Sequence, residues 1–291
     1  MPELPEVETI RRQLCTAGVK GRTIEQVTIS WPRTVEPLSP AAFSKRVSGK
    51  TIERLSRHGK WLIFELNDID NLLVHLRMTG GFYLSEGALK KGPHDRAIFQ
   101  LSGGMNLHFR DPRKFGRFRL AAFPLGLGPD ALEITARPFF HSTNGREAGL
   151  PKAGRQRNEV KWQTLEKSNR MLKPLLLDQS FIAGVGNIYA DEALFEARLN
   201  PERRAGTLND DEKLALYMAV TNVIRSAVEN GGTSLGDGQG NYVDLKGNSG
   251  GHREKVKVYG RAGQPCVECG ATLEKITLAQ RSTVFCAHCQ K

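Results

Sequence analysis

The chain opens with Met1-Pro2-Glu3-Leu4-Pro5-Glu6-Val7-Glu8, and this stretch decides how the N-terminal part folds. Two prolines and three glutamates make it short, stiff and acidic. Pro5 suits the first position of a helix, and acidic residues favour the first turn. Apolar residues then recur at helical spacing as far as Ala17, and Gly18 is a typical stop. We therefore predict that a helix, with Cys15 among its buried residues, holds the N-terminus in place.

From about Thr23 to Ala122 the pattern becomes that of strands. Apolar and polar residues alternate over 72–78, and the runs 97–101 and 105–110 flank Ser102-Gly103-Gly104, a hairpin signal. Several short strands joined by tight turns are typical of a two-layer antiparallel sandwich. The sequence therefore predicts an α+β protein whose N-terminal part is an antiparallel β-sandwich preceded by a helix.

Residues 123–157 are rich in proline, glycine and charge, and we expect the domain hinge there. The hydrophobic period then becomes helical, with helices predicted over 161–166, 170–177, 188–197 and 210–229, the last capped by Asn209. The stretch Gly184-Val185-Gly186-Asn187 either offers free helix amides to a phosphate or is an ordinary capped turn. Residues 231–252 hold eight glycines, which predicts a mobile loop without a core, either a lid or a linker.

The C-terminal cysteines have the most specific spacing in the chain. Two Cys-x2-Cys pairs are separated by sixteen residues, which supplies four thiolates for one tetrahedral zinc: Cys266, Cys269, Cys286 and Cys289. The residues between them predict a hairpin, and hence a zinc ribbon. Four thiolates leave no position for a substrate, so the predicted zinc is structural, with His288 a bystander.

Composition and charge point to nucleic acid. The chain has 291 residues, with 42 Lys plus Arg against 31 Asp plus Glu, for a net charge of +11. The excess is concentrated in three segments, 104–119, 152–173 and 253–291, which predicts one polyanion touched at several points. No run of eighteen apolar residues and no secretory signal is present, so we expect no membrane span. Five cysteines do not suit a disulfide framework, which favours the cytoplasm.

Together these stretches resemble the formamidopyrimidine-DNA glycosylases of bacteria, and the resemblance runs nearly the whole length. The motifs that carry it are 2–9 (Pro-Glu-Leu-Pro-Glu-Val-Glu-Thr), 75–80 (His-Leu-Arg-Met-Thr-Gly), 111–116 (Asp-Pro-Arg-Lys-Phe-Gly), 184–190 (Gly-Val-Gly-Asn-Ile-Tyr-Ala), the four-cysteine ribbon, and 279–281 (Ala-Gln-Arg) within it. The resemblance implies a helix–two-turn–helix domain between the sandwich and the ribbon. It also implies base-excision repair: a glycosylase for 8-oxoguanine and formamidopyrimidines joined to a β,δ-elimination lyase acting on damaged duplex DNA.

The resemblance also implies catalytic roles. With Met1 removed, the secondary amine of Pro2 would be the nucleophile, and an α-amino group is far more often neutral at pH 7 than a lysine. Glu3 would donate a proton to the opening sugar, although a solvated acid is the plain alternative. Lys60 would assist β-elimination, and Arg281 would grip phosphate and serve δ-elimination. Glu6 would position water, hold the N-terminus or only favour the helix start.

Six further residues match DNA contacts of the family. Met78, Arg113 and Phe115 would fill the space left by the everted nucleotide, the two apolar ones as wedges and the guanidinium against the orphaned base. Phosphate and other DNA contacts would come from His94, Lys173 and Asn187. One region departs from the family: near Gly250-Gly251-His252-Arg253 the usual aromatic is missing and the loop is longer. Lesion preference is therefore left open.

The predicted organisation is a catalytic sandwich over 1–135, a linker over 136–157, a helix–two-turn–helix domain over 158–232, a lesion-recognition loop over 233–259 and a zinc ribbon over 260–291. We expect a monomer, cytoplasmic and associated with the nucleoid through DNA. Two other functions stay open. One is an endonuclease VIII-like glycosylase for oxidised pyrimidines, against which Leu4 argues. The other is a zinc-ribbon DNA-binding protein without chemistry, which leaves the acidic N-terminus unexplained.

Overall fold

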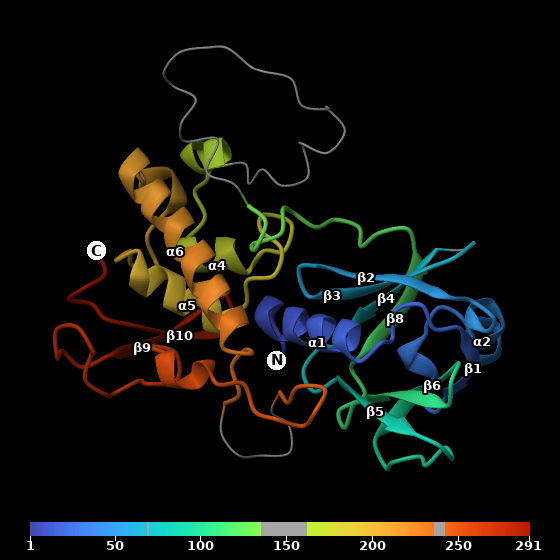
Figure 1. The fold of residues 1–291 in the computed structure, drawn as a ribbon. Helices are drawn as coiled ribbons and strands as arrows, with labels where there is room; N and C mark the ends of the chain where they lie inside the picture. Colours follow the sequence, from blue (N-terminus) through green and yellow to red (C-terminus); the bar gives the residue numbers. More distant parts are fainter. Residues whose placement is uncertain (69, 135–161, 236–241) are drawn as a thin grey trace. The chain divides into compact units, whose positions relative to one another are not determined.

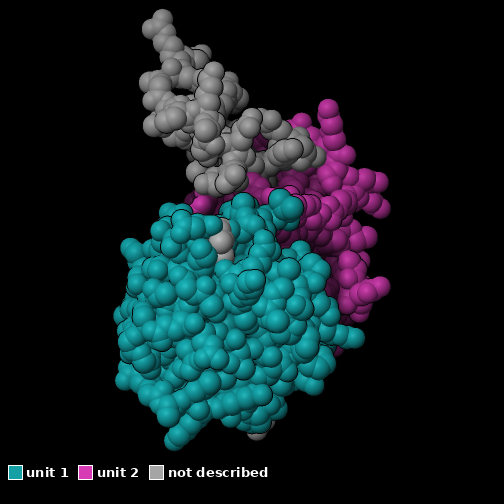
Figure 2. Space-filling view, turned by 90° about the vertical axis from the view of Figure 1, so that its right-hand side faces the viewer, with its two compact units in different colours: residues 1–125, 227–253 teal, residues 126–226, 254–291 magenta. Residues whose placement is uncertain are grey.

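The structure is a computed structural model that describes residues 1–68, 70–134, 162–235 and 242–291 (Figure 1). Two compact units form, one from residues 1–125 and 227–253 and the other from 126–226 and 254–291 (Figure 2). The chain thus returns to unit 1 at the end of a long helix of unit 2. The domain boundaries proposed from the sequence stay a prediction, and the predicted linker 136–157 lies outside the described residues.

Unit 1 is a sandwich of two four-stranded antiparallel sheets, as the strand pattern predicts. One sheet has the order β1-β6-β7-β5, and the other has the order β2-β3-β4-β8. The strands are β1 (Ile24–Ile29), β2 (Ile52–His58), β3 (Trp61–Leu66), β4 (Asn71–His75), β5 (Gly81–Glu86), β6 (Asp95–Leu101), β7 (Met105–Arg110) and β8 (Arg117–Ala121). Inward side chains of both sheets merge into one core, in which six phenylalanines are buried: Phe43, Phe64, Phe82, Phe99, Phe109 and Phe118.

Two helices cover the sandwich in unit 1. Helix α1 (Leu4–Thr16) packs against β2 and β3, and α2 (Pro40–Val47) packs against β1, while the short helix η1 (Pro32–Thr34) contacts β8. Helix α1 begins one residue earlier than predicted and buries Val7, Ile10 and Leu14. Gly18 follows its end with φ +72°, the left-handed conformation of a helix stop. Cys15 is half-buried rather than buried, because it lies at the edge of the buried face.

The alternating stretch 72–78 does not stay extended to its end. Strand β4 stops at His75, and Arg77 has φ +58°. The backbone N–H of Arg77 donates to Nδ1 of His75 at 3.0 Å, which turns the chain out of the sheet. The turn places Met78 and Thr79 on a loop in front of β5.

Unit 2 holds the remaining helices and the ribbon. Its helical elements are η3 (Trp162–Lys167), α4 (Leu172–Leu177), α5 (Asn187–Glu196), η4 (Ala205–Thr207) and α6 (Asp210–Glu229), and η5 (His252–Lys255) crosses the unit boundary. The helix expected over 161–166 is a 3-10 helix, and α4 begins two residues later than predicted. Helix α6 has its predicted bounds and its predicted cap, because Asn209 Oδ1 accepts the N–H of Glu212 at 2.9 Å.

The predicted hairpin of the ribbon is present as β9 (Glu274–Leu278) and β10 (Arg281–Phe285). The two residues between the strands, Ala279 and Gln280, have φ +47° and +61°, as in a two-residue turn that follows the twist of the strands. The apolar base of the hairpin packs with Phe195 of α5 and with Val258.

Candidate active site and DNA interface

The N-terminal corner of unit 1 is buried and hydrogen-bonded to helix α1. Pro2 and Glu3 are both buried, although Met1 is exposed. The N–H of Glu3 donates to Oε2 of Glu6 at 2.7 Å, so the first turn of α1 holds the residue that follows Pro2. A carboxylate is a strong acceptor for such an N–H, and this bond lies in the protein interior. Pro2 is therefore fixed in place by a buried helix, as the sequence analysis predicts.

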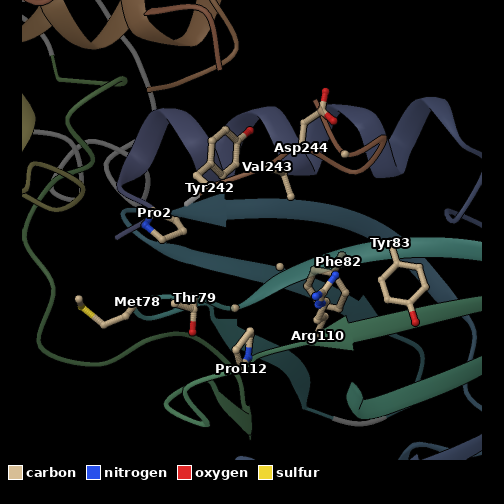
Figure 3. Close-up of a pocket in the computed structure, with 13 residues that line it drawn as sticks. Pro2, Met78, Thr79, Phe82, Tyr83, Arg110, Pro112, Tyr242, Val243 and Asp244 are labelled. Carbon is tan, nitrogen blue, oxygen red and sulfur yellow. The ribbon is translucent and has the colours of Figure 1, made fainter. Parts of the chain in front are cut away.

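A cavity of about 300 Å³ lies within unit 1 and has Pro2 in its wall (Figure 3). Its other walls come from the Met78–Tyr83 segment, from Arg110 and Pro112, and from Tyr242 to Asp244 with Gly247. Figure 3 shows the Pro2 ring on the same side of the cavity as the ring of Tyr242, with Met78 and Thr79 below them. The cavity thus opens beside the predicted nucleophile, where a small planar group could enter.

One wall of this cavity belongs to the glycine-rich stretch, and here the sequence analysis is wrong. Residues 231–252 are predicted to contribute nothing to a core, but Tyr242 and Leu245 are each 8% exposed and join the core of unit 1. Gln13 of α1 binds the stretch twice, through Asp244 Oδ2 at 2.8 Å and the N–H of Leu245 at 2.9 Å. Among the described residues this stretch is therefore an anchored wall, and not a featureless linker.

Glu6 joins the N-terminal corner to the same stretch. Its Oε1 accepts the N–H of Thr233 at 2.8 Å, while Oε2 accepts the N–H of Glu3. Glu6 is only 1% exposed, and a Cβ on Gly232 would come within 2.8 Å of its Oε1. The carboxylate therefore joins the N-terminal corner to Thr233, which supports holding the N-terminus among the roles that the sequence left open.

Lys60 lies in the turn between β2 and β3 and is 7% exposed, so it is not an ordinary surface lysine. Burial, together with the charges of Arg77 and Lys60, lowers the pKa of His75 to about 3. His75 is consequently neutral at pH 7, and its Nδ1 accepts from the backbone of Arg77. The positive charge of Lys60 therefore acts on His75, the first residue of the 75–80 motif.

The Asp111–Gly116 loop displays the predicted wedge residues. Asp111 is buried and accepts from the hydroxyl of Thr79 at 2.5 Å and from the N–H of Gly116 at 2.7 Å. Arg113 and Phe115 are exposed at the tip, with the guanidinium carbon 5.0 Å from the ring centroid. Because Thr79 follows Met78, the same contact joins the loop to the third predicted wedge. An exposed phenylalanine stacked under an arginine suits a base or base pair as its partner.

His94 is half-buried, and the next residue, Asp95, belongs to a buried polar network. Asp95 Oδ2 accepts from Tyr83 at 2.7 Å and lies 3.0 Å from Nδ1 of His108, while Ser85 lies 2.8 Å from Nε2. The order serine–histidine–aspartate is that of a hydrolase triad, but His108 is fully buried beneath the stacked ring of Tyr83. The network is therefore structural, and it fixes the turn that carries His94.

In unit 2, Asn187 and Lys173 both bind the ribbon hairpin. Gly186 and not Asn187 is the N-cap of α5, and the side-chain amide of Asn187 donates to the carbonyl of Ser282 at 3.1 Å. Lys173 is fully buried, and its Nζ donates to the same carbonyl at 2.8 Å and lies 2.6 Å from Asp191. The structure therefore disagrees with Lys173 as a surface phosphate contact, because Asp191 draws its ammonium inward.

Arg281 is exposed at the start of β10, next to the turn at residues 279–280. The four cysteines lie at the other end of the ribbon, with all four Sγ atoms within 4.8 Å of one another. Cys269 and Cys286 are 3.5 Å apart and Cys266 and Cys289 are 3.9 Å apart, close to the value of about 3.8 Å expected when tetrahedral zinc binds sulfur at about 2.3 Å. The site fits one structural zinc ion.

Three residues that the structure places at or behind the site are not among those predicted from the sequence. Tyr242 and Thr233 lie in the stretch predicted as a mobile loop, although Tyr242, Val243 and Leu245 are an apolar group within it. Asp191 lies in the middle of α5, where no pattern marks it. Burial raises the pKa of Asp191, and the charge of Lys173 opposes that rise. The sequence does not show that such a helical carboxylate is buried, because this depends on Lys173 and Val284, which are distant in the chain.

The fold and the site together define a class of protein. A sandwich with a cavity at its N-terminal proline, an exposed arginine–phenylalanine loop, a helical unit and a four-cysteine ribbon are the parts of a DNA glycosylase that everts its target nucleotide. No helix of the described chain is long and apolar enough to cross a membrane.

Comparison with known proteins gives the family. Residues 1–118 match the formamidopyrimidine-DNA glycosylase N-terminal domain, 148–238 match the H2TH domain of the same enzymes, and 263–291 match the zinc finger found in FPG and IleRS. Formamidopyrimidine-DNA glycosylases of Carboxydothermus hydrogenoformans and Desulfitobacterium hafniense are 40% identical over the full length of both chains. The chain belongs to the formamidopyrimidine-DNA glycosylase family.

Solved structures agree. A Lactococcus lactis FPG mutant in complex with DNA containing Fapy-dG has a TM-score of 0.83 and 31% identity, covering all of both chains. A Lactococcus lactis Fpg bound to abasic-site DNA scores 0.82, covering 99% of each chain. The MutM (FPG) protein of Thermus thermophilus scores 0.80 with 40% identity, covering 99% of this chain and 98% of that one. These relatives confirm the α+β fold with sandwich, helical domain and ribbon.

Proposed function

We propose that this enzyme excises oxidised purines from duplex DNA and cleaves the strand, with the nitrogen of Pro2 as nucleophile. Family membership makes it a DNA glycosylase of base-excision repair. The observation that supports the residue assignment is the cavity, because Pro2 stands in its wall and the helix α1 fixes the next residue. A nucleotide turned out of the duplex would bring its C1′ carbon to that nitrogen.

The chemistry requires a free amine, so we propose that Met1 is removed. The lone pair of Pro2 attacks C1′ and the base leaves, with Glu3 protonating the opening sugar. The secondary amine then forms an iminium ion, which carries its charge without a proton. This cation acidifies a C2′ hydrogen, and loss of that proton expels the 3′ phosphate; a second elimination expels the 5′ phosphate. Lys60 assists the first elimination and Arg281 the second.

The remaining site residues hold the DNA. Met78, Arg113 and Phe115 fill the space of the everted nucleotide, and His94 and Asn187 contact the backbone. Lys173 has a supporting role, since it is buried. Zinc bound by the four cysteines folds the ribbon that presents Arg281. We expect cytoplasmic enzyme, associated with the nucleoid through DNA, in keeping with five cysteines outside disulfides.

Borohydride trapping tests the assignment. The reagent reduces an iminium ion to a stable amine, so a lesion-containing duplex should become attached to Pro2 and be found there by peptide mapping. We expect Pro2→Gly to bind DNA but to lose most lyase activity, whereas Pro5→Ala, a proline change within α1, keeps the adduct. Absence of an adduct with Met1 demonstrably removed would refute the role of Pro2 and favour a binding protein without chemistry.

A cleavage panel separates the two enzymatic alternatives. Duplexes with 8-oxoguanine, a formamidopyrimidine or an oxidised pyrimidine are compared at equal enzyme concentration. We expect kcat/KM to be highest for the purine lesions, in keeping with Leu4 and with the matched family. Preference for the oxidised pyrimidine would favour the endonuclease VIII-like alternative.

A further inference from the structure

We propose that Asp191 is a positioning residue for the phosphate grip: together with Lys173 it clamps strand β10 and so places Arg281. The inference rests on the proposed role of Arg281. It concerns a buried carboxylate of α5, which three elements (η4, α6 and η5) separate in sequence from the hairpin that it binds.

The clamp joins α4, α5 and β10 through four short contacts. Asp191 Oδ1 lies 2.6 Å from Nζ of Lys173, and Asp191 Oδ2 accepts the N–H of Val284 at 3.1 Å. Lys173 in turn donates to the carbonyl of Ser282 at 2.8 Å, and Asn187 donates to the same oxygen at 3.1 Å. Two backbone groups of β10, two residues apart, are therefore held from one side by three side chains of the helices.

The burial of the Lys173–Asp191 pair indicates that the pair has a role other than stability. The side chains of Lys173 and Asp191 are 0% and 1% exposed. Taking two charges out of water costs free energy that their attraction only partly offsets, and an apolar pair of similar volume is often as stable. Stability alone therefore gives little reason for this pair. Its directional contacts with the β10 backbone, by contrast, fix a position that an apolar pair would leave free.

The held segment is the one that carries Arg281. Ser282 is its neighbour in the chain, and the turn before it consists of Ala279 and Gln280 with positive φ. The apolar contacts with Phe195 anchor the opposite, cysteine-bearing end of the hairpin. The clamp thus sets the tip and the apolar cluster sets the base. Loss of the clamp should let the tip move, with Arg281 on it, while the zinc site stays intact.

Glu192 provides a matched control on the same helix. It is also a buried carboxylate, and it accepts the N–H groups of residues 257, 258 and 259 at 2.8, 2.9 and 2.8 Å. These contacts hold the segment that leads into the ribbon and do not involve β10. Glu192→Gln removes the same charge as Asp191→Asn without touching the strand that carries Arg281.

The first test measures binding to a duplex with a tetrahydrofuran abasic site over a series of salt concentrations. One lost phosphate contact lowers the slope of log K against log salt by about one. We expect this for Arg281→Ala, for Asp191→Asn and, with no further loss, for the double variant. Loss of a carboxylate would by charge alone tighten DNA binding, so weaker binding of Asp191→Asn reports position. Glu192→Gln should keep the wild-type slope.

The outcomes separate the two claims. A wild-type slope in Arg281→Ala refutes the proposed role of Arg281. A reduced slope in Arg281→Ala with a wild-type slope in Asp191→Asn, or a double variant that loses about two units, overturns the clamp alone.

The second test removes the charges but keeps the fold. The paired change Lys173→Met and Asp191→Leu replaces the ion pair by apolar groups. It also removes the acceptor of the buried Val284 N–H, so we expect a folded protein whose melting temperature is a few degrees below that of the wild type. Binding should still show the reduced slope, and the ratio of β,δ- to β-elimination product should fall as in Arg281→Ala. If the pair only stabilised the fold, that product ratio would stay unchanged. The inference is overturned if this folded variant binds DNA with the wild-type salt slope and gives the wild-type product ratio.

Discussion

Glu6→Gln is the sharpest test of how the cavity is held. The carboxylate accepts the N–H of Glu3 at 2.7 Å and the N–H of Thr233 at 2.8 Å, one on each oxygen. Glutamine has one acceptor oxygen, so one of these N–H groups must face an NH2 group instead. Hydrogen bonds to charged groups contribute about 1.5–3 kcal/mol each. We therefore expect local opening of the chain at Thr233 to become easier by about 2 kcal/mol, or about 30-fold.

Amide hydrogen exchange measures this opening directly. Peptides covering 227–235 and 242–252 should exchange about 30-fold faster in Glu6→Gln, while peptides of β6 and β7 keep the wild-type rate. The control is Glu25→Gln on β1, an exposed carboxylate of the same unit, which should change neither. Wild-type exchange of both peptides would refute the reasoning, because it would mean that Glu6 does not hold the chain at Thr233.

Three further outcomes follow from single contacts. Gly80→Ala should destabilise unit 1 by about 1–3 kcal/mol in urea unfolding, since its Cβ would lie 2.4 Å from the carbonyl of Leu76; Gly81→Ala, with nothing within 4 Å, should be nearly neutral, and equal effects would contradict this. Burial would raise the pKa of Glu8, but its arginine partners lower it to about 2. Glu8→Gln should therefore lower the free energy of unfolding by about 2 kcal/mol at pH 7, after allowance for solvent screening. This loss should become smaller as the pH drops from about 4.5 to 2, because the wild-type carboxylate is then protonated; a loss that does not depend on pH would contradict the argument. Chelation of zinc should abolish DNA binding and expose amides of 263–291 but not those of the sandwich, and unchanged affinity would show that the ribbon is dispensable.

The parts of the fold that the sequence predicts are those with local causes. Asn209 caps α6 because its own side chain reaches the N–H three residues on, and the cysteine spacing alone brings four sulfurs together. The errors come from contacts between distant segments. Tyr242 is buried because Gln13 and α1 receive its neighbours, and Lys173 is buried because Asp191 accepts its charge. Neither partner is visible from a spacing pattern.

The three glutamates of the opening stretch have three different roles around Pro2. Glu8 binds Arg11, Arg12 and Arg57 and so ties α1 to β2, while Glu6 ties the helix start to Thr233. Glu3, next to Pro2, has the proposed chemical role. The same carboxylate accepts the N–H of Glu3 and the N–H of Thr233, so a movement at Thr233 acts on the residue next to Pro2. We therefore predict that a variant that loosens the contact of Glu6 with Thr233 also shifts Pro2, the proposed nucleophile, and so lowers kcat as well as raising KM.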